Sequence, residues 1–181
     1  MRVIDGLLKR RQMFAVVIGL VDGILTALTL AAGRVVVSPD PLDISLGLRI
    51  SAGASLSGAF IFFTAEYARL RGELARAERQ LMLTPRGRLA ATKLGGAVFR
   101  ETVTGAATSS IFSFLGALAP LLTGALLPRW SWLAVVAAIS ALGGLGFGLS
   151  RFVHGNPFRW AVVLMIAGGF LSLVGMRLRI V

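Results

Sequence analysis

The chain has 181 residues, of which 56% are hydrophobic, and its mean hydropathy is +0.81. These values lie outside the range of soluble domains and predict an integral membrane protein. The formal charge is +11, but the basic residues lie between apolar stretches, so we expect them to meet lipid headgroups and not nucleic acid. The chain contains no cysteine, which excludes disulfides and thiolate chemistry.

The first apolar stretch, Met13 to Val37, carries a single carboxylate, Asp22, near its middle. At 1.5 Å per residue the stretch is about 36 Å long, enough to cross a hydrocarbon core of about 30 Å. An acid at the centre of such a helix costs about 2.5–3.5 kcal/mol on insertion, and intramembrane acids commonly mark transport pathways. The alternative is a buried acid that hydrogen-bonds to a neighbouring helix for structural reasons alone.

Small and hydroxylated residues accompany this acid. Gly19 and Gly23 lie four residues apart on either side of it, so the backbone of another helix can approach closely. Thr26 and Thr29 follow one and two turns later on roughly the same face and add hydroxyl oxygens. We therefore predict a polar pathway through the membrane with Asp22 at its midpoint.

Four further apolar stretches are long enough to span the membrane: 46–67, 102–127, 133–150 and 160–176. The second span includes Gly58 among several small residues, a pattern that favours close helix packing. The third span contains Pro120, which is predicted to kink it. It also aligns a row of mostly small residues on one face: Gly105, Ser109, Ser113 and Ala117. The only histidine, His154, lies in a basic turn and is expected to be interfacial rather than a ligand.

The composition changes abruptly to charged and helix-forming residues over 68–101, and this segment is predicted to form a short cytoplasmic helical hairpin. Apolar residues follow alternating three- and four-residue steps on a helix that continues the second span: Tyr67, Leu70, Leu74, Ala77 and Leu81. Thr84 and Pro85 are predicted to end this helix, and a second short helix is predicted over 89–99.

Four glutamates belong to this region or its borders. Glu73 and Glu78 are expected to form ordinary ion pairs on the helix surface. Two spacings favour such pairs: Arg69–Glu73 and Glu73–Arg76. Glu66 and Glu101 lie near the two membrane borders of the hairpin and are better candidates for attracting cations.

The distribution of basic residues predicts the orientation. When the N-terminus is placed inside, most of the 19 Lys and Arg residues fall in cytoplasmic segments. We therefore expect five spans, with the N-terminus in the cytoplasm and the C-terminus outside. The sequence shows no sign of organelle targeting, so a prokaryotic cytoplasmic membrane is the expected location.

Several of these motifs resemble the vacuolar iron transporter family. GLVDGILTALTLAAG, at 19–33, is similar to the first-helix motif of that family, including its central aspartate. AGASLSG at 52–58 resembles its second helix, and SFLGALAPLL at 113–122 resembles its third. Residues 148–175 are similar to its last loop and helix. The resemblance covers most of the membrane part of the chain.

The resemblance implies an all-α homodimer that moves Fe²⁺ or Mn²⁺ out of the cytoplasm, commonly in exchange for protons. The first helices of the two protomers would lie at the dimer axis, and each would supply one Asp22 as a metal ligand. Thr26 and Thr29 would assist, and Glu66 and Glu101 would attract cations. Two facing carboxylates suit a hard divalent cation, and their like charge favours proton exchange. The metal is the transported ion, and no permanently bound cofactor is implied.

Departures from the family pattern leave a second hypothesis open. Ser57 aligns with a position where the family typically has a metal-binding methionine, and Arg49 aligns with one where an acid is common. Residues 68–101 are also too few for the family's glutamate-rich cytoplasmic metal-binding domain. The chain is therefore either a metal transporter or a diverged relative that carries another solute or serves as a dimeric membrane scaffold. An enzyme is not predicted, because the spans contain no pair of acids with nucleophile geometry.

Overall fold

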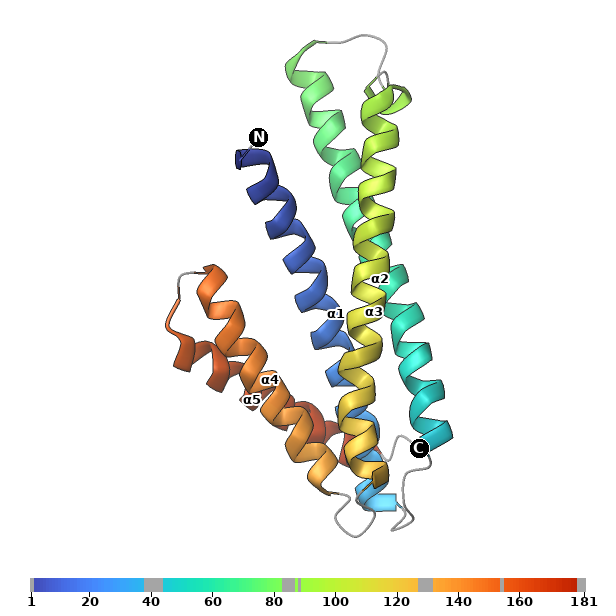
Figure 1. Ribbon diagram of the computed structural model, residues 1–181, viewed down its shortest axis with the longest axis vertical. Coiled ribbons are helices and arrows are strands. Elements are labelled where there is room, and N and C mark those ends of the chain that lie inside the picture. Colours follow the sequence, from blue (N-terminus) through green and yellow to red (C-terminus); the bar gives the residue numbers. More distant parts are fainter. Residues whose placement is uncertain are drawn as a thin grey trace.

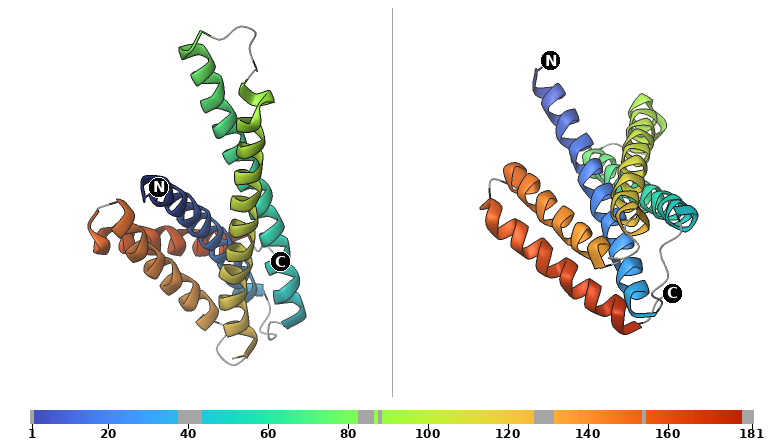
Figure 2. Two further views of the ribbon diagram at one scale, coloured as in Figure 1. Left: turned by 45° about the horizontal axis from the view of Figure 1, so that its top comes forward. Right: turned by 60° about the horizontal axis from the view of Figure 1, so that its bottom comes forward.

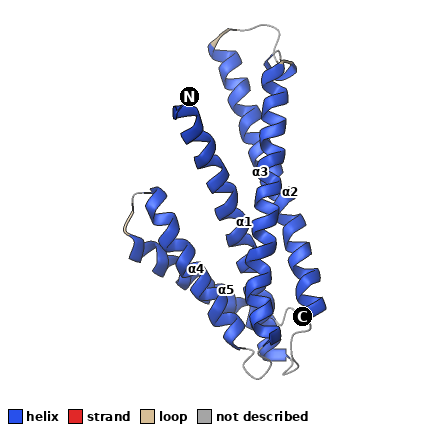
Figure 3. Ribbon diagram, viewed as in Figure 1, coloured by secondary structure: helices blue, strands red, loops and turns tan. Residues whose placement is uncertain are grey.

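The computed structural model describes residues 2–37, 44–82, 87, 89–126, 132–153 and 155–178. Five long helices make up most of this part: α1 (Arg2–Val37), α2 (Ile44–Gln80), α3 (Lys93–Leu126), α4 (Trp132–Val153) and α5 (Pro157–Leu178). A short 3₁₀ helix, η1 (Leu89–Ala91), precedes α3, and the described residues contain no strand (Figure 3). Each long helix is long and apolar enough to cross a membrane. This confirms the prediction of an all-α, multi-pass membrane protein.

The five helices run alternately up and down through the bundle (Figure 1). The start of α1, the end of α2 and the start of α3 lie toward one end, which we call the basic end, and α4 runs toward the same end but stops short of it. Two further views show α2 and α3 side by side, α4 and α5 diverging from them as a second pair, and α1 between the pairs (Figure 2). The sequence segments rich in Lys and Arg therefore adjoin the same end of the bundle.

Helix α1 is the central helix, because it contacts each of the other four. One face of it packs against α4 through buried residues that are mostly alanine and leucine: Ile24, Leu28, Ala31, Ala32, Ala134, Val135, Ala138 and Leu142. A second cluster joins it to α2 and α3: Ala27, Ala54, Ala117 and Leu121. The small side chains in both clusters let the helix axes approach closely, so α1 is held from several sides.

Helices α2 and α3 form a long hairpin that extends past the other helices at the basic end (Figure 1). Helix α2 has 37 residues and continues the second span without a break, as predicted. The prediction of a separate short helix over 89–99 is wrong, because α3 begins at Lys93 and continues through the third span. The glycines of this segment lie in the first turn of α3, and it has no proline, so nothing in the sequence ends the helix before the span. Pro120 lies inside α3, and the helix continues to Leu126.

Glu78 stabilises the end of this hairpin through hydrogen bonds. Its side chain is buried, and its two carboxylate oxygens accept hydrogen bonds from the backbone N–H of Gly87 at 2.8 Å and of Leu89 at 2.6 Å. The prediction that Glu78 lies on the helix surface is therefore wrong. Backbone amides near a turn have no partner within a helix, and the Glu78 carboxylate accepts the hydrogen bonds of two of them.

Several predicted features fall outside the described residues. They include the helix-ending Thr84 and Pro85 and the lone His154. The predicted boundaries of the last two spans shift outward, since α4 ends at Val153 and α5 begins at Pro157.

Candidate functional site

Asp22 lies where α1, α2 and α3 meet. The Oγ of Ser113 on α3 donates a hydrogen bond to Asp22 Oδ2 at 3.0 Å. Gly58 of α2 lies against the same carboxylate, because a Cβ there would be 2.8 Å from Asp22 Oδ2 and 3.2 Å from Ser113 Oγ. Gly58 therefore leaves the space that the carboxylate and its hydroxyl donor occupy. Asp22 itself is half-buried within the protomer.

Glycines on both sides of Asp22 bring the backbones of α1 and α3 into contact. A Cβ at Gly19 would overlap the carbonyl oxygen of Ser109, and one at Gly23 would overlap that of Ser113. Gly116 of α3 also permits this close contact, since a Cβ there would lie 2.8 Å from the carbonyl oxygen of Leu20 on α1. The close contact fixes the position of Ser113 relative to Asp22.

The hydroxyls of Thr26 and Thr29 donate hydrogen bonds to carbonyls of their own helix. Thr26 Oγ1 donates to the Asp22 carbonyl at 2.9 Å, and Thr29 Oγ1 donates to the Thr26 carbonyl at 3.0 Å. Their protons are thereby occupied, while the oxygen lone pairs stay available to accept a hydrogen bond or to bind a cation. Both residues are half-buried.

Further hydroxyls lie along the contacts of α3 with its neighbours. Ser55 of α2 and Ser110 of α3 share a hydrogen bond of 2.6 Å. Ser109 is fully buried, and its Oγ has no hydrogen-bond partner among the described residues. The sequence placed Ser109 and Ser113 on one face of the third span but did not indicate that Ser113 would bind Asp22.

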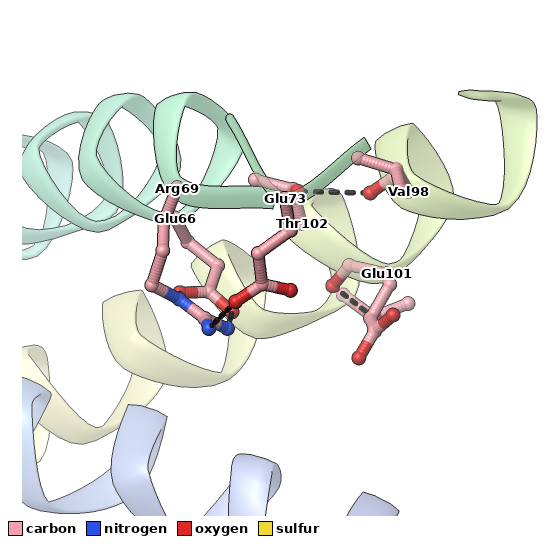
Figure 4. A network of polar contacts seen from close by, with 7 residues as sticks. Glu66, Arg69, Glu73, Val98, Glu101 and Thr102 are labelled. Atoms are coloured by element: carbon pink, nitrogen blue, oxygen red, sulfur yellow. Dashed lines mark hydrogen bonds and ion pairs between the residues drawn. The ribbon is translucent and has the colours of Figure 1, made fainter. Parts of the chain in front are cut away.

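A second polar group lies at the basic end, where Glu66, Glu73 and Glu101 form what we call the acidic cluster (Figure 4). Arg69 binds Glu66 through two hydrogen bonds, Nε to Oε2 at 2.8 Å and a terminal nitrogen to Oε1 at 2.5 Å. It also pairs with Glu73 at 2.5 Å, which confirms the predicted Arg69–Glu73 pair. Glu101 lies on the neighbouring α3.

An apolar layer separates the acidic cluster from Asp22. Its buried members are Ala15, Phe62 and Ala106, and the ring of Phe62 fills the space beside Gly105. Glu66 lies two turns beyond Gly58 on α2, or about 12 Å along the helix axis. The structure therefore brings Asp22 together with Gly19, Gly23 and Gly58 but places Glu66 and Glu101 in a separate site.

The described residues contain no group of three or more His, Cys, Asp or Glu side chains that would hold a metal ion. The described part of the chain thus supplies a single carboxylate at mid-span, with serine and threonine oxygens around it. Ser57 and Arg49 are both exposed on α2. Comparison of the chain with protein-family models and with curated proteins finds no match.

Proposed function

We propose that the protein is a membrane transporter that exports a divalent metal ion, Fe²⁺ or Mn²⁺, from the cytoplasm in exchange for protons. The placement of Asp22 carries this proposal. Its carboxylate lies in the middle of a span, and the described residues offer it one neutral hydroxyl donor and no cationic side chain. One neutral hydrogen bond does not offset the cost of a carboxylate at that depth. A transported cation or a proton would complete the site.

A homodimer is part of the proposal. Four residues of α1 follow a 4-3-4 spacing and are half-buried within one protomer: Ile18, Asp22, Leu25 and Thr29. Ile18 also packs against the cluster of Ala15, Phe62 and Ala106, and Leu25 against the cluster shared with α4, so the seam would use their remaining exposed surface. This spacing is typical of a seam between two packed helices. A second copy packed along the seam would bring two Asp22 carboxylates together at the two-fold axis. Oxygen ligands of this kind suit hard divalent cations.

The proposed orientation places the basic end in the cytoplasm, because positively charged segments are retained there. The acidic cluster then faces the compartment from which the metal leaves, where its carboxylates would attract divalent cations. Iron or manganese is chosen over other divalent ions because the segment 19–33 resembles the vacuolar iron transporter family. Membership of that family is part of the proposal.

A second candidate function is a diverged relative that carries another solute or serves as a dimeric scaffold. The bidentate pairing of Arg69 with Glu66 favours it, because this pairing occupies an acid that would otherwise bind cations. The exposed Ser57, where a methionine ligand would be expected from the resemblance, favours it as well.

The transport proposal is tested with purified protein in proteoliposomes. Fe²⁺ or Mn²⁺ entry is followed with a trapped metal indicator under an imposed pH gradient, and proton movement is followed with a second dye. We expect metal flux that dissipates the pH gradient. Absence of metal flux from a folded dimer would favour the second candidate.

The dimer seam is tested separately with single cysteines, since the chain has none of its own. Ile18→Cys is expected to form an intermolecular disulfide under mild oxidation, because the seam places the two copies of this residue close to the axis. Ala27→Cys is the matched control, since this residue is fully buried in the cluster shared with α2 and α3. Equal crosslinking of both variants, or of neither, would contradict the seam.

A further inference from the structure

Ser109 differs from three other buried hydroxyls of the bundle, each of which donates to a carbonyl one turn earlier in its own helix: Ser51 to Gly47 at 2.8 Å, Thr102 to Val98 at 2.8 Å and Ser150 to Phe147 at 2.7 Å. Ser109 is 0% exposed, and its Oγ lacks any such partner within the described part of the chain. An unpaired buried hydroxyl is unfavourable, so this position calls for a further hydrogen-bonding group.

The surroundings of Ser109 indicate which group this is. Ser109 lies one helical turn from Ser113, which donates to Asp22, and its backbone lies against Gly19 of α1. Side chains four residues apart on a helix have Cβ atoms about 5–6 Å apart. A water molecule that makes two hydrogen bonds of about 2.8 Å at a tetrahedral angle joins oxygen atoms about 4.5 Å apart, a separation within reach of two hydroxyls one turn apart.

We infer that Ser109 holds a buried water molecule that is hydrogen-bonded to the Asp22–Ser113 pair and thereby fixes the position of the Asp22 side chain. Ser109 is then a positioning residue. It lies on the basic-end side of Asp22, immediately before the apolar layer that contains Ala106 and Phe62. The part that Asp22 takes in transport rests on the proposed function, whereas the hydration of Ser109 does not.

Hydration is tested by thiol chemistry, because a cysteine reacts with methanethiosulfonates as the thiolate, which does not form in a dry apolar contact. Ser109→Cys is compared with Ala117→Cys, two turns along the same face of α3, in an apolar cluster and equally buried. With 2-aminoethyl methanethiosulfonate, we expect Ser109→Cys to react at least about tenfold faster than Ala117→Cys. Equal rates would overturn the inference.

The link to Asp22 is tested by repeating the reaction in an Asp22→Leu background. Loss of the carboxylate removes an acceptor for the water, so the rate at Ser109→Cys should fall toward that of Ala117→Cys. An unchanged rate would overturn the inference, because the water would then be independent of Asp22. Size-exclusion profiles and thermal unfolding midpoints of all variants confirm that the comparison is made on folded protein.

A second measurement keeps the inference testable if the double variant does not fold. The carboxyl stretching band that disappears in Asp22→Asn is assigned to Asp22 by infrared difference spectroscopy. Ser109→Ala should shift this band, because it removes the support of the water. Ser51→Ala should leave it unchanged, since that hydroxyl is satisfied by the Gly47 carbonyl. A band that is unmoved in Ser109→Ala would contradict the inference, whether or not the protein transports metal.

Discussion

Substitution of Gly58 by alanine perturbs the Asp22 site without altering any charge. The added Cβ would lie 2.8 Å from Asp22 Oδ2, about 0.6 Å closer than the 3.4 Å at which ordinary contact begins. The carboxylate is the more mobile of the two groups, so it must swing away from α2. Its hydrogen bond from Ser113, now 3.0 Å, is expected to break as a result.

The energetic consequence is the difference of two terms. Loss of a hydrogen bond to a charged group costs about 1.5–3 kcal/mol, whereas alanine in place of glycine in a helix contributes up to about 1 kcal/mol. We therefore expect Gly58→Ala to lower the free energy of unfolding by about 1–2 kcal/mol. Displacement of the carboxylate from its place between the three helices should reduce metal flux by about tenfold, which corresponds to about 1.4 kcal/mol.

Gly53→Ala is the matched control, since Gly53 is on the same helix and a Cβ there meets nothing within 4 Å. Thermal unfolding in detergent and metal flux in proteoliposomes are measured for both variants. Gly53→Ala should match the wild type or be slightly more stable. The reasoning is refuted if Gly58→Ala behaves like Gly53→Ala in both assays, because the space at Gly58 would then not determine the position of Asp22.

Three further substitutions test other parts of the structure. Gly23→Ala should destabilise the bundle by about 1–3 kcal/mol in thermal unfolding because its Cβ would overlap the α3 backbone, whereas Gly169→Ala, which meets nothing, should not. Glu78→Gln should speed hydrogen exchange of the amides at 87 and 89; unchanged exchange would show that the carboxylate does not hold them. Arg69→Gln should lower the apparent KM for the metal a few-fold, because Glu66 and Glu73 lose the cation that pairs with both, while Arg71→Gln should leave it unchanged.

The membrane architecture could be predicted from the sequence because hydrophobic length is a property of each segment alone. Five apolar stretches separated by polar turns predicted five spans, and the described residues form five helices suited to crossing a membrane. Alternating apolar steps after Tyr67 likewise predicted that the second helix extends past the membrane, which α2 does. Leu70, near the start of that pattern, is buried, whereas Leu81, at its end, is exposed. Burial of these apolar side chains therefore decreases toward the end of α2.

The partners of individual side chains could not be predicted, because periodicity identifies a face of a helix but not the helix that covers it. Gly19 and Gly23 indicated a close approach near Asp22 without indicating that α3 makes it. Glu78 was expected on the surface because it stands in a charged run, whereas its binding partners are turn amides nine and eleven residues later. Whether the Ser109 hydroxyl has a partner among the described residues depends on how the helices pack, which the sequence pattern does not show.

The most direct test of the account is metal flux by Asp22→Asn compared with the wild type, in proteoliposomes loaded with equal amounts of protein under the same pH gradient. Asparagine keeps the size of the side chain and an oxygen that accepts the Ser113 hydrogen bond, but it can neither carry the charge nor exchange the proton. We predict that the variant retains the unfolding midpoint and the oligomeric state of the wild type and loses Fe²⁺ and Mn²⁺ flux. Transport by the variant at the wild-type rate would contradict the central role of Asp22.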